Sequence, residues 1–479
     1  MATISSAGIG SGLDVNSIVT QLMAIERQPV TALQTKATKI QTQISEFGKQ
    51  KSAMSTLRDA ARKLTNTDTW GATVGSSSNT NAVDVTTTSG AAVGNYAVEV
   101  SSLAASQSLA SAVFPASTST PGAGTLHIEL GAWNTGQTAF TPKTGATAVD
   151  ITIAATDTLA QVRDKINASG AGVTALVFTD ASGSRLLMRS STTGVDNAFR
   201  TTVVDGDGGN TDAAGLSRLA YDPSAGAAVM TRTQAAANAV ATFNGLPVSS
   251  ASNTLTNIVD GMTLKLKGLT AGAVEVGVVQ DNESLTKAVQ AFADAYNALS
   301  TLIATQTKYD AGTKTGGPLQ GDGAAVGLQR QMRQLAGASS SASTVFARLA
   351  DIGLVTGSDG TMSVNTGKLD NALANPTEMK KLLSNSDILD PTKNGIAKQF
   401  RVLGDTLLGT DGSITTRSEG LRQRLNQNQT AQDKLNDRIA MTEKRLRAQY
   451  TALDATMGKL TALSGYVTQQ IAQFNKSSS

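Results

Sequence analysis

Residues 425–474 are LNQNQTAQDKLNDRIAMTEKRLRAQYTALDATMGKLTALSGYVTQQIAQF, and one row of this stretch repeats every seven residues. Seven of the eight positions in the row are apolar, and its members are Leu425, Gln432, Ile439, Leu446, Leu453, Leu460, Val467 and Phe474. No proline follows Pro391, and such a row is typical of a coiled-coil seam. About sixty residues of helix would span on the order of 90 Å. The sequence therefore predicts a C-terminal rod that needs a partner helix.

The companion row of the predicted seam is irregular. Its positions are Leu421, Asn428, Leu435, Thr442, Gln449, Thr456, Leu463 and Gln470, and the neighbouring row adds Tyr450, Met457 and Ile471. This drift is expected when 3.6 residues per turn meet a seven-residue repeat. We interpret it as two successive partners, with a change near residue 446.

A matching helix is predicted near the N-terminus. Apolar residues recur there at steps of mostly three and four, at Leu33, Ala37, Ile40, Ile44, Phe47, Met54, Leu57, Ala61 and Leu64. We expect residues 33–64 to pair with residues 417–445 within one chain as a coiled-coil leg, and its contact residues are Leu33, Ile40, Ile44, Phe47, Leu425, Leu435 and Ile439.

The apolar rows at the two ends of the chain have few other elements of the same chain to pack against. Asp14 is a predicted N-cap for a short helix, which Pro29 should end or kink. We expect residues 4–25 and 446–474 to be loosely ordered in the free chain and to make intermolecular contacts. The expected oligomer or filament contacts are Ile18, Leu22, Ile25, Leu446, Leu453, Leu460, Val467, Ile471 and Phe474.

The middle of the chain changes to a period of two, which is typical of half-buried strands. Asn244-Gly245 is a strong hairpin signal, whereas residues 158–167 form a predicted helix within a mixed α/β module. The predicted fold is α+β and multidomain, with a long coiled-coil leg from both chain ends and two central β-rich domains, one inserted in the other. The expected boundaries are a terminal segment 1–30, leg 31–75, β domain 76–118, inserted α/β domain 119–230, β domain 231–283, leg 284–445 and terminal helix 446–479.

Composition excludes several classes of function. The 479 residues carry a formal charge of +3, with 16% charged and 4% aromatic residues, which does not indicate binding to nucleic acid or an anionic membrane. There is no cysteine and one histidine, His127, so metal sites and histidine-based catalysis have almost no ligands or bases to use. We expect an ordinary surface histidine, no cofactor, no metal and no enzyme.

Two glycine-rich segments could suggest ligand sites. Residues 321–327 precede a helix but lack the glycine spacing of a dinucleotide motif, so we interpret them as a helix start rather than a phosphate loop. In residues 205–210, Asn210 stands where an EF-hand needs glycine, which favours a turn over a calcium site.

Targeting signals are also absent from the sequence pattern. The first ten residues, MATISSAGIG, have neither a basic start nor an apolar core, and no apolar run approaches the length of a membrane span. An exported chain would therefore use a route without a cleavable signal peptide, and the lack of cysteine suits passage through a channel in an unfolded state.

Several motifs resemble one family. GIGSGLDVNSIV at residues 8–19, continuing to Pro29, is similar to the N-terminal signature of the flagellar filament cap family, hook-associated protein 2. DKINASGAGVTA at residues 164–175 resembles the Ile-Asn motif of flagellins and hook-associated proteins. Further matches lie at residues 243–264, 318–322, 352–360 and 412–414. The last block departs slightly, since residues 450–454 are YTALD where the family has Phe first.

The resemblance implies a secreted, self-assembling cap at the distal tip of the flagellar filament, which promotes flagellin polymerisation, prevents flagellin leakage and supports motility. It implies a homo-oligomer such as a pentamer, with flagellin, hook-associated junction proteins and a cytoplasmic export chaperone that binds the C-terminal segment as partners, and with no nucleic acid or membrane. Two alternatives stay open: another hook-associated structural protein, or a tip adhesin for host mucin or glycans.

Overall fold

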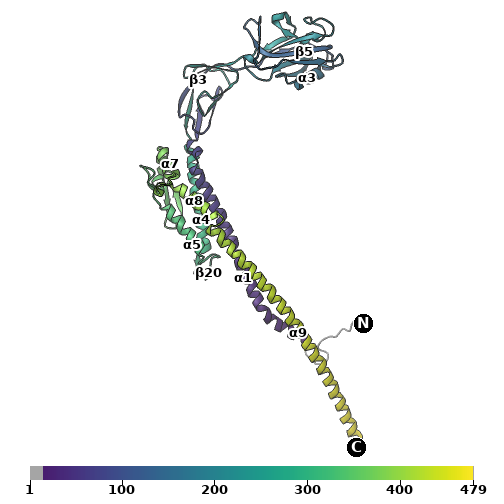
Figure 1. The fold of residues 1–479 in the computed structure, drawn as a ribbon, viewed down its shortest axis with the longest axis vertical. Coiled ribbons are helices and arrows are strands. Elements are labelled where there is room, and N and C mark those ends of the chain that lie inside the picture. The colour runs from purple at the N-terminus through teal and green to yellow at the C-terminus, as the bar shows by residue number, and fades with distance from the viewer. Residues whose placement is uncertain (1–13, 478–479) are drawn as a thin grey trace. The chain divides into compact units, whose positions relative to one another are not determined.

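The computed structural model describes residues 14–477 and divides into two compact units (Figure 1). One unit comprises residues 1–66 and 285–479, and the other comprises residues 67–284. The long helices near the two chain ends therefore belong to the same unit, as the paired apolar rows predict.

Two long helices dominate the first unit. Helix α1 (Val15–Thr65) begins after Asp14, whose carboxylate accepts a hydrogen bond from the Ser17 backbone N–H at 3.0 Å. Helix α9 (Ser413–Ser477) is 65 residues long and lies beside α1 (Figure 1). The expected end of the first helix at Pro29 is wrong, because α1 continues through it. Pro29 is exposed, so water can solvate the backbone carbonyl that loses its helical partner.

Shorter helices pack around the upper part of this pair. They are α4 (Asn282–Thr307), α5 (Gly323–Ala336), α6 (Thr366–Leu373), α7 (Pro376–Ser384) and α8 (Ile396–Leu408). Phe400 of α8 contacts Phe292 and Tyr296 of α4 edge-on, with ring centroids 5.2 and 5.9 Å apart. Helix α8 was not predicted from the sequence, although it packs directly on α1.

Two small hairpins complete this unit. They are β19 (Tyr309–Asp310) with β20 (Thr315–Gly316), and β21 (Leu354–Thr356) with β22 (Met362–Val364).

The second unit contains a β domain built from two antiparallel sheets over one core. The five-stranded sheet has the order β1-β18-β3-β14-β15 and the three-stranded sheet has the order β16-β17-β2. A short helix α2 (Thr67–Gly71) leads into strands β1 (Thr73–Ser77), β2 (Val83–Thr87), β3 (Gly94–Ser102), β14 (Ala239–Phe243), β15 (Leu246–Ser250), β16 (Thr254–Thr256), β17 (Met262–Leu266) and β18 (Val274–Gln280). Asn244 and Gly245 form the predicted turn, with φ of 49° and 81°.

A second domain is inserted between β3 and β14. Helix α3 (Leu159–Ala168) packs on a four-stranded sheet of order β13-β4-β9-β8, beside a larger sheet centred on β5. The strands are β4 (Ser108–Ala110), β5 (Gly124–Trp133), β6 (Phe140–Pro142), β7 (Val149–Ile153), β8 (Val173–Asp180), β9 (Gly183–Ser190), β10 (Ala198–Asp205), β11 (Tyr221–Asp222), β12 (Ala227–Ala228) and β13 (Thr231–Gln234).

The insertion leaves and rejoins its host at neighbouring points. Ala105 and Ala237 form a β-bridge, with backbone hydrogen bonds of 2.9 and 3.1 Å. Leu109 and Phe114 belong to the core of the inserted domain. The mixed α+β fold with a leg from both chain ends and an inserted domain agrees with the sequence prediction.

Candidate assembly surface on the terminal helices

Helices α1 and α9 form an antiparallel pair in which the predicted leg residues face the interior. Phe47, Ile40 and Ile439 are buried, with exposed fractions of 1%, 6% and 4%. Leu33, Ile44, Leu425 and Leu435 are half-buried. The structure thus places the expected leg residues at buried or half-buried positions of the two helices.

Polar side chains interrupt this apolar seam at two levels. Gln432, the polar member of the seven-residue row, donates from Nε2 to Oδ1 of Asn428 at 2.6 Å, and both side chains are buried. At the second level, Gln50 donates to Gln306 at 2.6 Å, and Gln306 donates to Glu46 at 2.6 Å. Asn428 of the irregular companion row therefore takes part in a buried hydrogen bond of the leg.

Glu46 illustrates the electrostatics of the second level. Burial raises the pKa of Glu46, but hydrogen bonds from Lys49 and Gln306 outweigh burial and hold the pKa below its ordinary value. The carboxylate thus stays ionised inside the polar level at neutral pH.

The lower part of the leg is a separate small cluster. Four α1 residues pack against Ile439 of α9, namely Val15, Val19, Met23 and Val30. Leu435, Leu446 and Tyr450 pack against the same cluster, and Arg27 lies 3.8 Å from Glu443 at its edge. The structure therefore places Leu446, an expected intermolecular contact, inside the chain's own helix pair.

The other N-terminal contact candidates lie on the outside of this cluster. Ile18 is half-buried, whereas Leu22 and Ile25 are 37% and 62% exposed. Residues 4–13, for which intermolecular contacts were also expected, lie outside the described residues. The free apolar surface of the described α1 segment is thus limited to Leu22 and Ile25, with part of Ile18.

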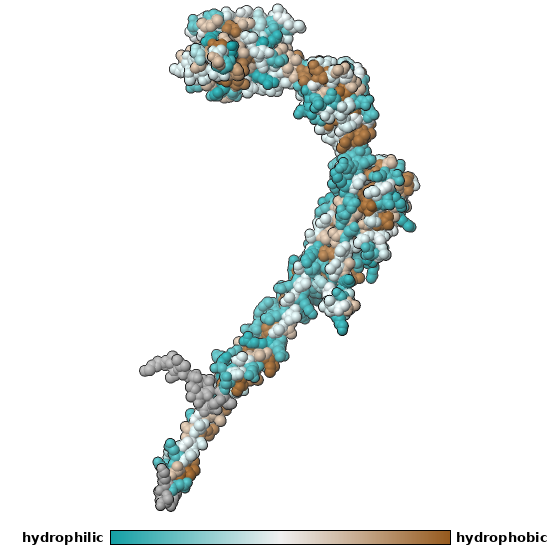
Figure 2. Space-filling model, turned by 180° about the vertical axis from the view of Figure 1, so that it is seen from behind, coloured by the Kyte–Doolittle hydropathy of each residue, from teal (hydrophilic) through white to brown (hydrophobic). Residues whose placement is uncertain are grey.

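Beyond Tyr450, α9 continues without α1 beside it (Figure 1). Large apolar side chains remain exposed along residues 451–475, here named the free segment, and they are Leu453, Met457, Leu460, Leu463, Tyr466, Val467 and Ile471, with exposed fractions from 39% to 59%. Figure 2 shows hydrophobic side chains on the surface of this end of α9. The side chain of Phe474 lies outside the described residues, although its backbone is helical.

The free segment keeps the spacing of a helix-packing seam. Steps of four, three, seven and four residues connect Leu453, Met457, Leu460, Val467 and Ile471 on one face. Complete burial of a large apolar side chain contributes about 1.5–3 kcal/mol relative to exposure. An apolar stripe of this size is therefore a strong candidate for contact with another helix.

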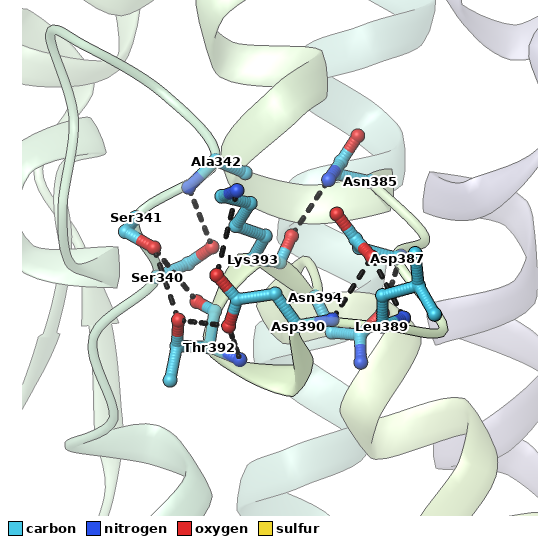
Figure 3. Close-up of polar contacts among 10 residues, drawn as sticks. All are labelled: Ser340, Ser341, Ala342, Asn385, Asp387, Leu389, Asp390, Thr392, Lys393 and Asn394. Carbon is cyan, nitrogen blue, oxygen red and sulfur yellow. Dashed lines mark hydrogen bonds and ion pairs between the residues drawn. The ribbon is translucent and has the colours of Figure 1, made fainter.

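A second exposed apolar feature was not predicted from the sequence. Ile388 and Leu389 are 94% and 95% exposed in the loop between α7 and α8. Figure 3 shows that polar contacts hold this loop: Asp387 accepts from the Leu389 backbone N–H at 2.9 Å, and Asn385 donates to the Lys393 carbonyl at 2.7 Å. A hydrogen-bonded loop thus holds two aliphatic side chains in solvent. Their exposure was not predicted because the loop has neither a seven-residue nor an alternating pattern.

Catalytic and ligand sites receive little support from the geometry. His127 lies on β5, and its Nδ1 is 2.6 Å from Asp150. Asp205 accepts hydrogen bonds from Ser217 and Asp322 caps α5, so both glycine-rich segments have structural roles. Within residues 14–477 no group of three or more metal-ligating side chains gathers, and no described helix is long and apolar enough to cross a membrane.

Three family models match the chain. Residues 11–107 match the N-terminus of flagellar hook-associated protein 2, residues 236–462 match its C-terminus, and residues 136–192 match the flagellin hook IN motif. The third match includes residues 164–175, where the sequence resembles the Ile-Asn motif.

Known proteins are similar in sequence to this chain over almost its whole length. Flagellar hook-associated protein 2 of Escherichia coli K12 is 32% identical over 98% of both chains, and the B-type protein of Pseudomonas aeruginosa is 31% identical over 98% of this chain and 97% of that one. The crystal structure of the D1-D2-D3 domains of the E. coli flagellar cap protein FliD gives a TM-score of 0.61 at 29% identity, covering 79% of this chain and 99% of that one. This chain therefore belongs to the flagellar hook-associated protein 2 family, the non-enzymatic cap proteins of the bacterial flagellum.

Proposed function

We propose that this chain assembles with copies of itself into a cap at the distal tip of the flagellar filament. There it promotes polymerisation of exported flagellin and prevents flagellin leakage, outside the cell. The observation that carries this proposal is the apolar stripe of the free segment, because a single chain leaves it exposed while its helical spacing suits a partner helix.

The division of α9 suggests how such a cap could hold and move. Up to Tyr450 the helix packs on α1 within the same chain, whereas the apolar side chains of the free segment are exposed among the described residues and are available for intermolecular contacts. Ile18, Leu22, Ile25, Leu453, Leu460, Val467, Ile471 and Phe474 are the proposed oligomer or filament contacts. Many contacts of modest strength can exchange one at a time, so the cap can shift as each flagellin subunit is added.

Further partners follow from family membership. We infer contacts with flagellin, with hook-associated junction proteins and, inside the cell before export, with a chaperone that covers the C-terminal segment. An exposed apolar helix is prone to non-specific association, which such a chaperone would prevent. A pentamer also belongs to this proposal.

Sedimentation velocity tests the role of the stripe. The triple variant Leu453→Asp, Leu460→Asp and Val467→Asp should lower the assembled fraction at least tenfold, since charges cannot be buried in an apolar seam. The matched control places the same three charges on the opposite side of the helix, as Thr451→Asp, Ala462→Asp and Gln469→Asp. Equal loss in both variants, or no loss in the first, contradicts the proposed contact face.

A gene deletion tests the function itself. Cells without this gene should release unpolymerised flagellin into the medium and lack long filaments, and the wild-type gene should restore both. Normal filaments in the deletion strain would overturn the proposed cap function.

A further inference from the structure

Helices α1 and α9 enclose a groove of about 590 Å³ on one side of the leg. Leu33, Ile40 and Leu421 supply apolar parts of its lining. Lys36, Lys39 and Arg424 are its charged residues, and no acidic side chain lines it. All three cations are exposed, and none forms an ion pair within residues 14–477.

A buried amide in the same groove lacks a hydrogen-bond partner. Asn428 is only 6% exposed, and its Oδ1 accepts from Gln432, but its Nδ2 has no partner among the described residues. An unpaired N–H group beside three cations favours an oxygen acceptor with negative charge. The groove therefore has the chemistry of a carboxylate-binding surface.

The positive charge extends further down the same side of α9. Arg438 follows Arg424 by fourteen residues, which is close to four helical turns, so both side chains lie on one side. Arg438 is exposed and has no ion pair within the described part of the chain. Lys36, Lys39, Arg424 and Arg438 are here named the basic flank.

Helix α9 carries three acids on another side, which also holds the exposed cations Arg422 and Lys444. Asp433 is two residues from Ala431 of the groove, a step of about 200° around the helix, so it is directed away from the groove. Glu419, Asp433 and Asp437 are exposed and make no ion pair among residues 14–477. These three residues are here named the acidic ridge.

The two sets share one spacing along the helix. Glu419 and Asp433 are fourteen residues apart, as are Arg424 and Arg438, and this distance corresponds to roughly 21 Å in both cases. Copies related by rotation about a ring axis have legs that run in the same direction. Two ion pairs can therefore form at once between neighbouring legs.

We propose that the basic flank of one leg binds the acidic ridge of a second copy of this chain. The contact joins two different surfaces, so each copy offers one of each and the series can close into a ring. This inference rests on the proposed self-assembly and adds which surfaces of the legs meet.

Charge reversal tests the pairing by sedimentation velocity. Arg424→Glu with Arg438→Glu places acids on both surfaces, and Glu419→Lys with Asp433→Lys places cations on both. Each variant alone should assemble at least tenfold more weakly than wild type, because like charges meet at the interface. An equimolar mixture should recover part of the assembly, since every contact between unlike copies again pairs opposite charges, whereas a ring of five keeps one contact between like copies. The control Arg330→Glu with Lys368→Glu changes exposed cations on α5 and α6 and should assemble as wild type.

The outcomes separate this inference from the proposed function. Assembly of either variant at the wild-type level, or a mixture no better than its components, overturns the pairing while the cap function stands. A wild-type chain that stays monomeric at high concentration contradicts self-assembly and this pairing with it. Weakening of wild-type assembly by salt is the further expected result, because the flank and ridge are exposed.

Discussion

The two parts of helix α9 differ in what covers them, although one apolar pattern runs through both. Up to Tyr450 the apolar side is covered by α1 and its neighbours, and Leu421 and Ile439 are almost fully buried. In the free segment the same kind of side chain is about half exposed. The seven-residue apolar pattern therefore determines that α9 is a helix with one apolar side. Whether that side stabilises the fold or stays available for assembly depends on where the partner helix α1 ends.

The largest expected contrast is between two leucine truncations in this helix. Leu421→Ala removes a fully buried side chain and should lower the free energy of unfolding by about 2–5 kcal/mol. Leu460→Ala should change it by less than about 0.5 kcal/mol, because the side chain is already exposed in the single chain. Urea unfolding of dilute protein, followed by circular dichroism, measures both. Equal costs would mean that the free segment is packed after all.

A smaller effect is expected at the lower cluster of the leg. Val19→Ala should cost about 1–3 kcal/mol, since Val19 is fully buried and its loss leaves a cavity. We expect this loss to be local and to speed amide hydrogen exchange in residues 15–30 more than in residues 40–64. Thr20→Ala, at an exposed neighbouring position, serves as the control. Uniformly faster exchange over α1 would instead show that the leg opens as one unit.

The polar level of the leg permits a gain in stability. Replacing both Asn428 and Gln432 by leucine removes the unpaired amide and should stabilise the chain by about 1 kcal/mol. Asn428→Leu alone should be less favourable, because it leaves the Gln432 amide without its acceptor. Thermal unfolding of both variants measures the difference. A less stable double variant would argue that the polar pair contributes to packing of α1 on α9.

The smallest expected effect is a dependence of stability on pH at Glu378 of α7, one of the shorter helices of the first unit. Hydrogen bonds from Lys381, Ser343 and the Thr344 backbone lower the pKa of Glu378 to about 2. The folded state therefore gains stability above the ordinary pKa near 4.5 and loses it as the pH falls toward 2. Glu378→Gln should flatten the change in melting temperature between pH 4.5 and 2. An unchanged slope would show that these hydrogen bonds do not persist in solution.

The sequence predicted the elements of the leg better than it predicted their partners. Steps of three and four residues identified both long helices, because burial of one helical side leaves a clear period. The same period cannot distinguish a partner in the same chain from one in another, so Leu446 was expected in an intermolecular contact. Helix α8 was not predicted, although its 13 residues make it longer than the predicted helix at residues 158–167. The expected helix end at Pro29 was wrong because a sequence pattern does not show that Pro29 is exposed.

The exposed surface was less predictable than the core. Ile388 and Leu389 follow no period, and their exposure depends on the hydrogen bonds of Asp387 and Asn385 within one loop. The acidic ridge and basic flank needed the orientation of α1 on α9, which a one-dimensional pattern does not contain.

The bridge between Ala105 and Ala237 holds the two connections of the inserted domain side by side, which makes this domain easy to remove or replace. Because the inserted domain departs and returns at adjacent backbone positions, removing or exchanging it leaves the host strands β3 and β14 joined over a short gap. A change in the size or surface of that domain therefore need not disturb the helices that assemble. Such an attachment lets the inserted domain change in sequence and size while the parts that must fit other subunits stay the same.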